Sequence, residues 1–256
     1  MLRDWQTECM YRVLWIRKVL EGRGVVYGNS GGKDCTLAGI LCRMATEKVL
    51  GVIMPCHSSV NYGTDREHAK LVAEKFRIET VEVDLSAVKT AFLDALNPTM
   101  DALELGGENR DKAMMNINPR LRMTTLYALA QARGAMVCGT GNRSEITTGY
   151  FTKWGDGAFD FNPIADLTAT EVFDFLRFLG APDVIINKAP SAGLFEGQTD
   201  EAEMGLRYAD IDEYILHGTG QPEIVAKIER QKVVTEHKRR MPLCYPEGAE
   251  EDWGVT

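Results

Sequence analysis

The strongest constraint on the fold is a repeated alternation of short apolar runs with longer segments of helical spacing. Apolar runs of strand length stand at residues 25–27, 49–54, 80–85 and 135–139. Strands joined by helices of ten or more residues pair in parallel. The sequence therefore predicts an α/β fold, a doubly wound and mainly parallel sheet with helices on both faces. No internal repeat or linker interrupts residues 1–256, so we expect a single domain with a helical C-terminal portion.

The helices between these runs are predicted from apolar spacing and from capping residues. The first predicted helix has Met10, Val13, Leu14 and Leu20 and ends at Gly22 and Gly24, and the second has Leu37, Ile40, Leu41 and Met44. The third runs from a capping box of Thr64 and Glu67 to Phe76, and the fourth has Asn118 as N-cap and Pro119 at its first position and continues through Leu126, Tyr127 and Ala130 to Gly134. The fifth runs from a capping box of Thr168 and Glu171 through Phe175, Leu176 and Leu179 to Gly180.

Composition excludes some classes of protein. With 29 basic and 37 acidic residues the formal net charge is −8, which disfavours nonspecific binding to nucleic acid. The chain lacks an apolar run long enough for a membrane span, and its N-terminus lacks the apolar segment of a signal peptide. The six cysteines include no CxxC pair, and this pattern is typical of reduced, buried thiols. We therefore expect a cytoplasmic protein that does not bind membranes.

Two unusual loops follow predicted strands, and ligands of such folds bind beyond the carboxyl ends of the strands. The first is GNSGGKDC at residues 28–35, and the second is GTGNRSE at residues 139–145. A kinase-type phosphate loop would need a glycine at Tyr27 and a serine or threonine at Asp34, so that pattern fails. The dinucleotide pattern G-x-G-x-x-G fails in the second loop, where Ser144 takes the place of the third glycine.

The pattern that remains in the first loop is S-G-G-x-D. Two glycines allow backbone N–H groups to approach an anion, and the helix that follows adds positive potential at its N-terminus. Ser30 can donate its hydroxyl hydrogen to a phosphate oxygen, whereas the carboxylate of Asp34 would repel phosphate. A carboxylate beside a polyphosphate suits a ligand of Mg²⁺. The alternative is that Asp34 only caps the helix and the glycines only turn the chain.

The loop resembles the SGGxDS signature of the N-type ATP pyrophosphatases, which cleave ATP between the α and β phosphates to adenylate a substrate. Three later segments resemble the ammonia-dependent NAD⁺ synthetase family, in the same order along the chain. They are GTGNRSE…GYFTKWGDGAFDFNPIADL (residues 139–167), KAPSAGLFEGQTDE (residues 188–201) and EHKRR (residues 236–240). From its charge alone, the segment at residues 236–240 would be predicted to be a solvated run of charged residues on the surface.

The resemblance implies that deamido-NAD⁺, ATP and ammonia react to give NAD⁺, AMP and pyrophosphate, with ATP as co-substrate and Mg²⁺ as metal. It implies catalytic and metal-binding roles for Asp34 and Glu145. The ATP-binding residues that it implies are Gly28, Asn29, Ser30, Gly31, Gly32, Lys33, Asp34, Cys35, Thr140 and Ser191. The residues implied to bind deamido-NAD⁺ are Arg120, Lys153, Asp160, His237 and Lys238.

Two positions depart from the family pattern. Cys35 stands where the signature usually has serine, and a thiol is a weaker donor to phosphate. Ala169 stands where the family usually has an ATP-contacting lysine, and Lys33 is a candidate substitute for that charge, although exposure to solvent is an equal alternative for Lys33. Tyr150, Phe151 and Trp154 could stack on a substrate ring, or they could pack in the core or against a second subunit.

The resemblance also implies a homodimer with substrate sites at the subunit interface. The chain has no room for a glutaminase domain, so free ammonia is the expected nitrogen donor. Two other hypotheses remain open at this point: an ATP pyrophosphatase-type ligase with a different substrate, and a nucleotide-binding protein without catalytic activity. Retention of both Asp34 and Glu145 weighs against the second of these.

Overall fold

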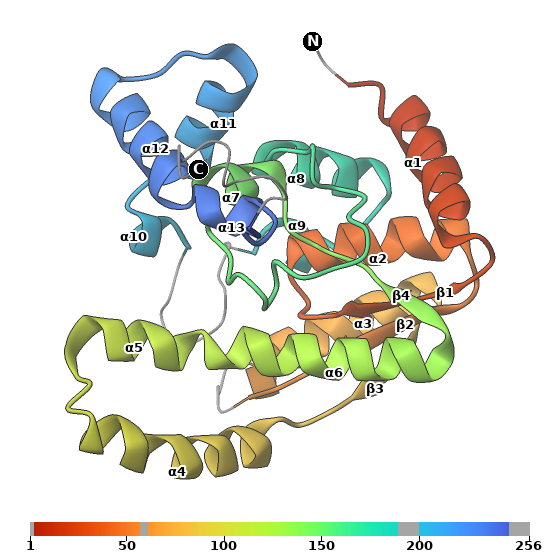
Figure 1. The fold of residues 1–256 in the computed structure, drawn as a ribbon. Helices are drawn as coiled ribbons and strands as arrows, with labels where there is room; N and C mark the ends of the chain where they lie inside the picture. The colour runs from red at the N-terminus through yellow and green to blue at the C-terminus, as the bar shows by residue number, and fades with distance from the viewer. Residues whose placement is uncertain (1–2, 57–60, 189–199, 246–256) are drawn as a thin grey trace, which may run out of the picture.

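The computed structural model describes residues 3–56, 61–188 and 200–245, and it contains a four-stranded parallel sheet between two layers of helices (Figure 1). The strand order is β3-β2-β1-β4, and all three pairings are parallel. The strands are β1 (Gly24–Gly28), β2 (Val49–Ile53), β3 (Glu79–Glu82) and β4 (Ala135–Val137). The predicted fold class is therefore confirmed.

Thirteen α-helices lie in the described part of the chain, together with a five-residue π-helical turn at Asn61–Asp65. They are α1 (Trp5–Leu20), α2 (Lys33–Ala45), α3 (Arg66–Phe76), α4 (Ser86–Ala102), α5 (Gly107–Met115), α6 (Ile117–Arg133), α7 (Arg143–Thr148), α8 (Ala169–Phe178), α9 (Asp183–Ile186), α10 (Asp200–Met204), α11 (Tyr208–His217), α12 (Pro222–Val234) and α13 (Glu236–Arg239). None of these helices is long and apolar enough to cross a bilayer.

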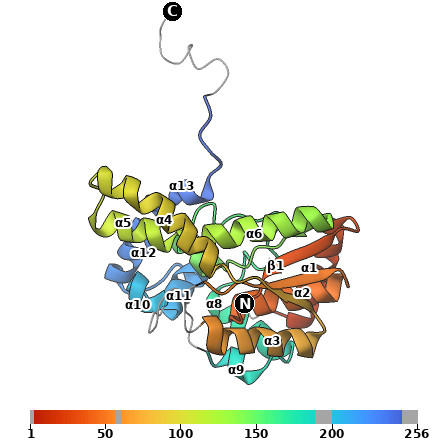
Figure 2. The same ribbon diagram turned by 90° about the horizontal axis from the view of Figure 1, so that it is seen from below.

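The two faces of the sheet carry different cores because side chains alternate along each strand. Val25 and Tyr27 of β1 pack with residues of α1, α2, α3 and α8, whereas Val26 between them packs with α6 on the other face. Figure 2 shows α4, α5 and α6 together on one side of the molecule, opposite α2 and α3. A third cluster joins α8 to the C-terminal helices and includes Ala169 and Tyr208.

Several sequence predictions of local structure were correct. Thr168 and Glu171 form the predicted capping box at the start of α8, and Gly134 ends α6 in the left-handed conformation with a φ of 60°. The strand predicted at residues 80–85 begins one residue earlier and is shorter, at Glu79–Glu82, although the N–H groups of Val83 and Leu85 still donate to the Ile53 and Pro55 carbonyls. Neither α4 nor α5 was predicted from apolar spacing or capping residues.

Two predicted helix starts were wrong. Thr64 and Glu67 make no capping box, because a π-helical turn that ends at Asp65 precedes α3. Asn118 is not an N-cap, because α6 begins one residue earlier and follows α5 almost directly. Its buried side-chain oxygen accepts a hydrogen bond from the Cys56 thiol at 3.4 Å, which is a tertiary contact.

The predicted helix α1 is confirmed, but the apolar residues that indicated it do not all face the core. Met10 and Leu14 are both 51% exposed, while Cys9 and Ile16 are buried. Apolar side chains occupy two adjacent stripes of this helix, so apolar spacing alone does not show which stripe faces the core. Packing against α2 selects the stripe with Cys9, Val13, Ile16 and Leu20. Met44 on α2 is likewise 45% exposed rather than buried.

Candidate active site

The two unusual loops meet in one cleft. They follow β1 and β4, which are adjacent parallel strands, so both loops leave the same edge of the sheet. The cleft between them has a volume of about 760 Å³. The predicted site residues that line it are Gly28, Asn29, Ser30, Gly32, Lys33, Asp34, Cys35, Thr140, Glu145 and Lys238.

The first loop is held in shape by its glycines and by Asn29. Gly31 has a φ of +70°, and a Cβ atom there would lie 2.4 Å from the Asp65 carbonyl oxygen, so only glycine fits. Asn29 is 1% exposed, and its side-chain amide donates to the Ala69 carbonyl at 3.1 Å. These contacts fix the loop against the start of α3. The Gly32 N–H donates to the Ser30 hydroxyl oxygen at 3.4 Å, and no side chain of the described residues caps the N-terminus of α2, which lines the cleft.

The Cys35 thiol, which replaces the usual serine, makes its polar contacts within the glycine loop. It is 4% exposed, and its sulfur lies 3.2 Å from both the Gly32 carbonyl oxygen and the Ser30 hydroxyl oxygen. The thiol therefore stabilises the turn of the loop, and it leaves the Ser30 hydroxyl as the stronger donor for an anion.

Asn142 connects the two predicted metal ligands. Its side-chain amide donates to Asp34 Oδ1 at 3.0 Å, and its backbone N–H donates to Glu145 Oε2 at 2.9 Å. Its side-chain oxygen accepts from the backbone N–H of Glu145 at 3.0 Å, which completes a capping box on α7. The carboxylates of Asp34 and Glu145 thus come from different strand ends and are held by one fully buried residue.

The carboxylates of Asp34 and Glu145 affect each other electrostatically. Burial, together with the charge of Asp34, raises the pKa of Glu145 well above its usual value. A divalent cation between the two carboxylates would remove this penalty. The donor set of carboxylate oxygens suits Mg²⁺, which commonly takes one or two carboxylates and fills its other positions with phosphate oxygens and water. The described residues contain no group of three or more His, Cys, Asp or Glu side chains that could hold a metal.

Lys33 is buried rather than exposed to solvent. It is 6% exposed, and its ammonium donates to Asp34 Oδ2 at 2.5 Å. The ammonium also lies 5.7 Å from the ring centre of Phe173 and 5.3 Å from that of Tyr208. Burial alone would lower the pKa of Lys33, but the carboxylates of Asp34 and Glu145 raise it above its ordinary value.

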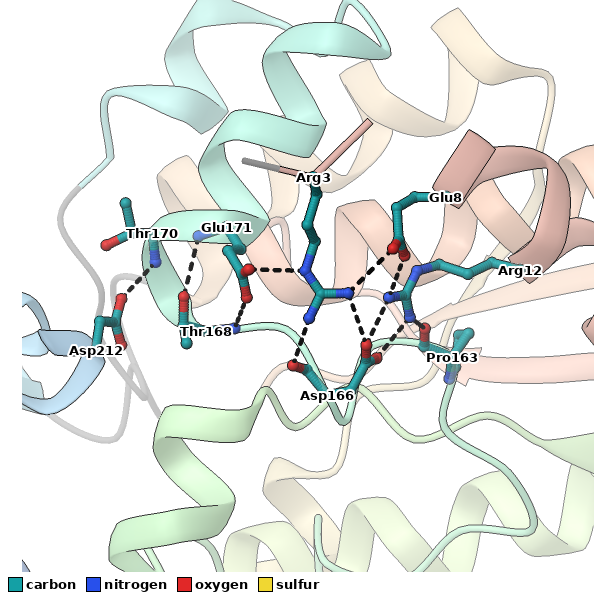
Figure 3. A network of polar contacts seen from close by, with 9 residues as sticks. All are labelled: Arg3, Glu8, Arg12, Pro163, Asp166, Thr168, Thr170, Glu171 and Asp212. Atoms are coloured by element: carbon teal, nitrogen blue, oxygen red, sulfur yellow. Dashed lines mark hydrogen bonds and ion pairs between the residues drawn. The ribbon is translucent and has the colours of Figure 1, made fainter. Parts of the chain in front are cut away.

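A buried polar network behind the cleft holds α7 and α8 together. The carboxylate of Asp212 on α11 is 3% exposed, and it accepts from the Ser144 hydroxyl at 2.5 Å. It also accepts from the Thr170 backbone N–H at 2.8 Å (Figure 3). The Ser144 oxygen in turn accepts from the backbone N–H of Ala169 at 3.0 Å. Glu145 is the next residue on α7, so this network fixes the helix that carries it.

The N-terminus of α8 is also anchored from its other side (Figure 3). Arg3 donates to Glu171 at 2.7 Å, and Arg12 donates to both oxygens of Asp166 at 2.6 and 2.7 Å. Although burial raises the pKa of Asp166, its hydrogen bond and charge interaction with Arg12 hold that pKa below its usual value. The segment before α8 is therefore tied to α1.

The other end of the cleft carries basic and aromatic side chains. The ammonium of Lys238 donates to the carbonyl oxygens of Gly149 and Phe151, each at 2.7 Å, and lies 5.4 Å from the Phe151 ring centre. Burial lowers the pKa of Lys238. Tyr150 and Phe151 line the cleft, whereas Trp154 is 49% exposed and does not.

Four predicted substrate-binding residues do not line the cleft. Arg120 lies in a separate groove, and Lys153 donates to the His237 carbonyl oxygen at 2.5 Å outside the cleft wall. Asp160 accepts from the Val137 backbone N–H at 2.7 Å and from the Tyr127 hydroxyl at 3.3 Å. Burial and the charge of Asp160 raise the pKa of Tyr127 to about 12. The predicted ATP-binding residue Ser191 lies outside the described residues.

The structure adds cleft residues that sequence reasoning missed. Arg122 lines the cleft and donates to the Met54 carbonyl at 3.2 Å, and an ion pair of Asp65 with Lys188 lies in the same wall. Asn142 could have been found, because N-x-x-E in NRSE is a capping-box pattern. Asp65 and Lys188 are distant in sequence, and no local pattern connects them.

The fold and the candidate site together define a class of protein. This is a parallel α/β protein that presents a glycine loop, an uncapped helix N-terminus and a carboxylate pair to one cleft, which is the arrangement of a nucleotide-binding enzyme acting on phosphates.

Comparisons with known proteins identify the family. A family model described as NAD synthase matches residues 9–242. The NH(3)-dependent NAD(+) synthetase of Carboxydothermus hydrogenoformans is 43% identical over 243 residues, which cover 93% of this chain and 97% of the relative. That of Pyrococcus horikoshii is 41% identical over 248 residues, which cover 91% of each chain. The chain therefore belongs to the NAD synthase family.

Solved structures agree with this assignment. NMN synthetase from Francisella tularensis superimposes with a TM-score of 0.87 at 31% identity, covering 96% of this chain and 100% of that one. NAD⁺ synthetase from Burkholderia pseudomallei gives a TM-score of 0.74 at 29% identity, covering 94% of this chain and 92% of that one.

Proposed function

We propose that this protein is a ligase that adenylates the nicotinate carboxylate of deamido-NAD⁺ with ATP and then amidates it with ammonia, giving NAD⁺, AMP and pyrophosphate. The observation that carries the proposal is the junction at Asn142, which joins the glycine loop through Asp34 to Glu145 in a chain of the NAD synthase family. The relatives named above are NH(3)-dependent, and this supports free ammonia as the nitrogen donor.

The chemistry explains why such a cleft is needed. A carboxylate is a resonance-stabilised anion that ammonia does not attack, so it must first become an acyl adenylate with AMP as leaving group. The backbone N–H groups around Gly32 and the Ser30 hydroxyl would bind the polyphosphate at the N-terminus of α2. Asp34 and Glu145 would hold Mg²⁺, which supplies charge neutralisation at the phosphates when bound.

The remaining cleft residues have orienting roles in this proposal. Arg122 and Lys238 place positive charge on the substrate side of the cleft, where deamido-NAD⁺ carries its own phosphates. Tyr150 and Phe151 offer rings on which a pyridine or adenine ring can stack. Thr140 lies on the second loop, beside the expected position of the adenosine.

The reaction can be tested directly. The protein is incubated with ATP, Mg²⁺, ammonium and deamido-NAD⁺, and NAD⁺, AMP and pyrophosphate are measured. Equal amounts of the three products are expected, and glutamine should not replace ammonium. Formation of ADP, or ATP cleavage that does not depend on deamido-NAD⁺, would contradict the proposal. Asp34→Asn should abolish AMP formation while circular dichroism and thermal unfolding show an intact fold.

A second substrate deserves a direct comparison, because the NMN synthetase structure superimposes with a higher TM-score than the NAD⁺ synthetase structure, 0.87 against 0.74. Nicotinate mononucleotide has the same pyridine carboxylate as deamido-NAD⁺ but lacks the adenylate half. The two substrates are offered together at equal concentration, and the ratio of the two amides gives the ratio of kcat/KM. An excess of nicotinamide mononucleotide would favour the mononucleotide as the natural substrate.

We also propose that the protein is a homodimer that pairs through α4, α5 and α6. None of the 17 residues of α4 is buried in the single chain, and Val88 and Phe92 are 50% and 46% exposed. An apolar groove of about 370 Å³ runs between these helices and includes Phe92, Leu96 and Ile117. A second copy would cover this apolar surface.

Arg120 gives this dimer a functional test. It lines the apolar groove and not the cleft of its own chain, so it could reach substrate only in the cleft of the second copy. Arg120→Ala and Asp34→Asn chains are co-expressed with different tags, and each is inactive alone. If Arg120 acts across the interface, random pairing restores about a quarter of the sites. No recovery in the isolated mixed dimer would refute the role of Arg120 in the partner's site.

Two broader predictions complete the proposal. The whole chain is proposed to act as one synthetase domain, because α8 contributes Phe175 to the core beside the sheet and Ala169 to the core of the C-terminal helices. A cytoplasmic location stays a prediction, supported by cysteines that are free throughout the described residues.

A further inference from the structure

Lys33 occupies a place where a cation is costly unless it is paired. It is the first residue of α2, where the helix field disfavours positive charge, and its side chain is 6% exposed. The contact that offsets this cost is the 2.5 Å hydrogen bond from its ammonium to Asp34 Oδ2. The rings of Phe173 and Tyr208 cover the ammonium from the side of α8 and α11.

Asp34 is consequently engaged on both oxygens. Oδ1 accepts from the Asn142 amide at 3.0 Å, and Oδ2 accepts from Lys33. The Asn142 contact is neutral and is compatible with a metal on the same carboxylate. The Lys33 contact is different, because an ammonium at 2.5 Å from Oδ2 would repel a divalent cation bound to that oxygen.

We propose that Lys33 is a displaceable counter-ion, which occupies Asp34 in the free enzyme and moves onto the polyphosphate when Mg²⁺ arrives with ATP. This inference rests on the proposed function, in which Asp34 holds the metal. Before the nucleotide binds, the ammonium neutralises Asp34 and competes with Mg²⁺ for it. After the nucleotide binds, the phosphates replace the carboxylate as its partner.

The exchange needs only a side-chain rotation. Lys33 begins α2 directly after the glycine loop and lines the cleft, and its flexible stem has four rotatable bonds. The consequence is an order of binding. Metal alone binds the enzyme weakly, whereas the metal–nucleotide complex brings both the cation for Asp34 and the anion for Lys33.

The test is the metal affinity of Lys33→Gln and Lys33→Met, because the inference predicts opposite effects with and without nucleotide. Mn²⁺ serves as the probe, and its free concentration is read from the electron paramagnetic resonance signal. Without nucleotide, both variants should bind Mn²⁺ about tenfold more tightly than the unmodified protein, because a competing charge is gone. With a non-hydrolysable ATP analogue, both should bind the complex about tenfold more weakly.

Two further variants control the experiment. Lys33→Arg keeps the charge and should keep weak binding of Mn²⁺ alone. Lys188→Gln removes a positive charge from the same cleft, but this lysine pairs with Asp65 and not with Asp34, so it should leave Mn²⁺ affinity without nucleotide unchanged. Thermal unfolding of every variant shows whether it is folded, and Lys33→Met keeps an apolar stem at this buried position if the glutamine variant unfolds.

The outcomes separate this inference from the proposed function. If Lys33→Gln and Lys33→Met bind Mn²⁺ alone no more tightly than the unmodified protein, the counter-ion role is wrong. Equal tightening by Lys188→Gln would also refute it, since the effect would then be a general one of cleft charge. If Asp34→Asn leaves Mn²⁺ binding unchanged with nucleotide present, the proposed metal site itself fails.

Discussion

Asn142 offers the sharpest test of how the active site is assembled, because one buried side chain performs two separable tasks. Its oxygen caps α7, and its amide orients Asp34. Asn142→Ser keeps a good cap but has no amide to reach Asp34. Asn142→Ala removes both. The pair therefore separates helix stability from the positioning of the carboxylate.

The expected magnitudes follow from these contacts. A cap is worth ~1 kcal/mol, and a hydrogen bond to a charged group is worth about 1.5–3 kcal/mol. Asn142→Ser should then lower the free energy of unfolding by about 2 kcal/mol, and Asn142→Ala by about 3 kcal/mol. For a chain of this size these changes correspond to losses in Tm of roughly 4–8 °C and 6–12 °C.

The functional effect should be the same for both variants, because both lose the contact to Asp34. The Mg²⁺ concentration that gives half the maximal rate of AMP formation should rise severalfold in each. Thr168→Ala is the matched control, since Thr168 caps α8 by the same pattern without touching Asp34. It should lose stability and keep its Mg²⁺ dependence. If Asn142→Ser loses stability while its Mg²⁺ dependence stays normal, Asn142 does not position the metal carboxylate.

Two other predictions concern stability. Arg12, whose side chain is 12% exposed, holds the pKa of Asp166 below its usual value, so the pair stabilises the fold above pH ~4 and the benefit is lost as the pH falls through the folded-state pKa. Asp166→Asn should lower Tm at pH 7 by an amount that shrinks as the pH falls below ~4, whereas Asp174→Asn, whose partner Arg177 is 56% exposed, should change Tm little throughout this range. The hydroxyl of Tyr27 is buried without a partner among the described residues, so Tyr27→Phe should raise Tm by roughly 2–4 °C. A Cβ on Gly39 would lie 2.5 Å from that hydroxyl oxygen and 2.6 Å from Cζ of the same ring, so Gly39→Ala should lower Tm with or without Tyr27→Phe. A Tyr27→Phe protein that melts earlier, or an Asp166→Asn deficit in Tm that does not shrink as the pH falls below ~4, would contradict the reasoning.

Much of the fold could be predicted from sequence because its signals are local. The alternation of apolar runs with helical spacing predicts a parallel sheet, and the capping box at Thr168 and Glu171 is formed by residues three apart. The capping box predicted at Thr64 failed because a π-helical turn ending at Asp65 precedes α3, and Asp65 there forms an ion pair with the distant Lys188. The N-cap predicted at Asn118 was wrong for a similar reason, because its buried side chain accepts a hydrogen bond from the Cys56 thiol.

In the candidate site, too, local sequence patterns predicted some features and only the tertiary structure showed the others. The glycine loop up to Asp34 was recognisable because its chemistry lies within a few consecutive residues. The partners of that loop were not recognisable in the same way. Phe173 and Tyr208 are about 140 and 175 positions away along the chain from Lys33, and only the packing of α8 and α11 brings their rings to its ammonium.

The sequence by itself determined the sheet class, the phosphate loop and the family to which the chain belongs, because each of these is written in short-range patterns of residue type. Only the tertiary structure decided which side chains share one cleft. It made Asn142 the junction between Asp34 and Glu145, buried Lys33 against the Asp34 carboxylate, and placed Arg120 in a groove outside the cleft. The physical reason is that charge interactions and hydrogen bonds depend on distance in space, and chain folding sets that distance independently of separation in sequence.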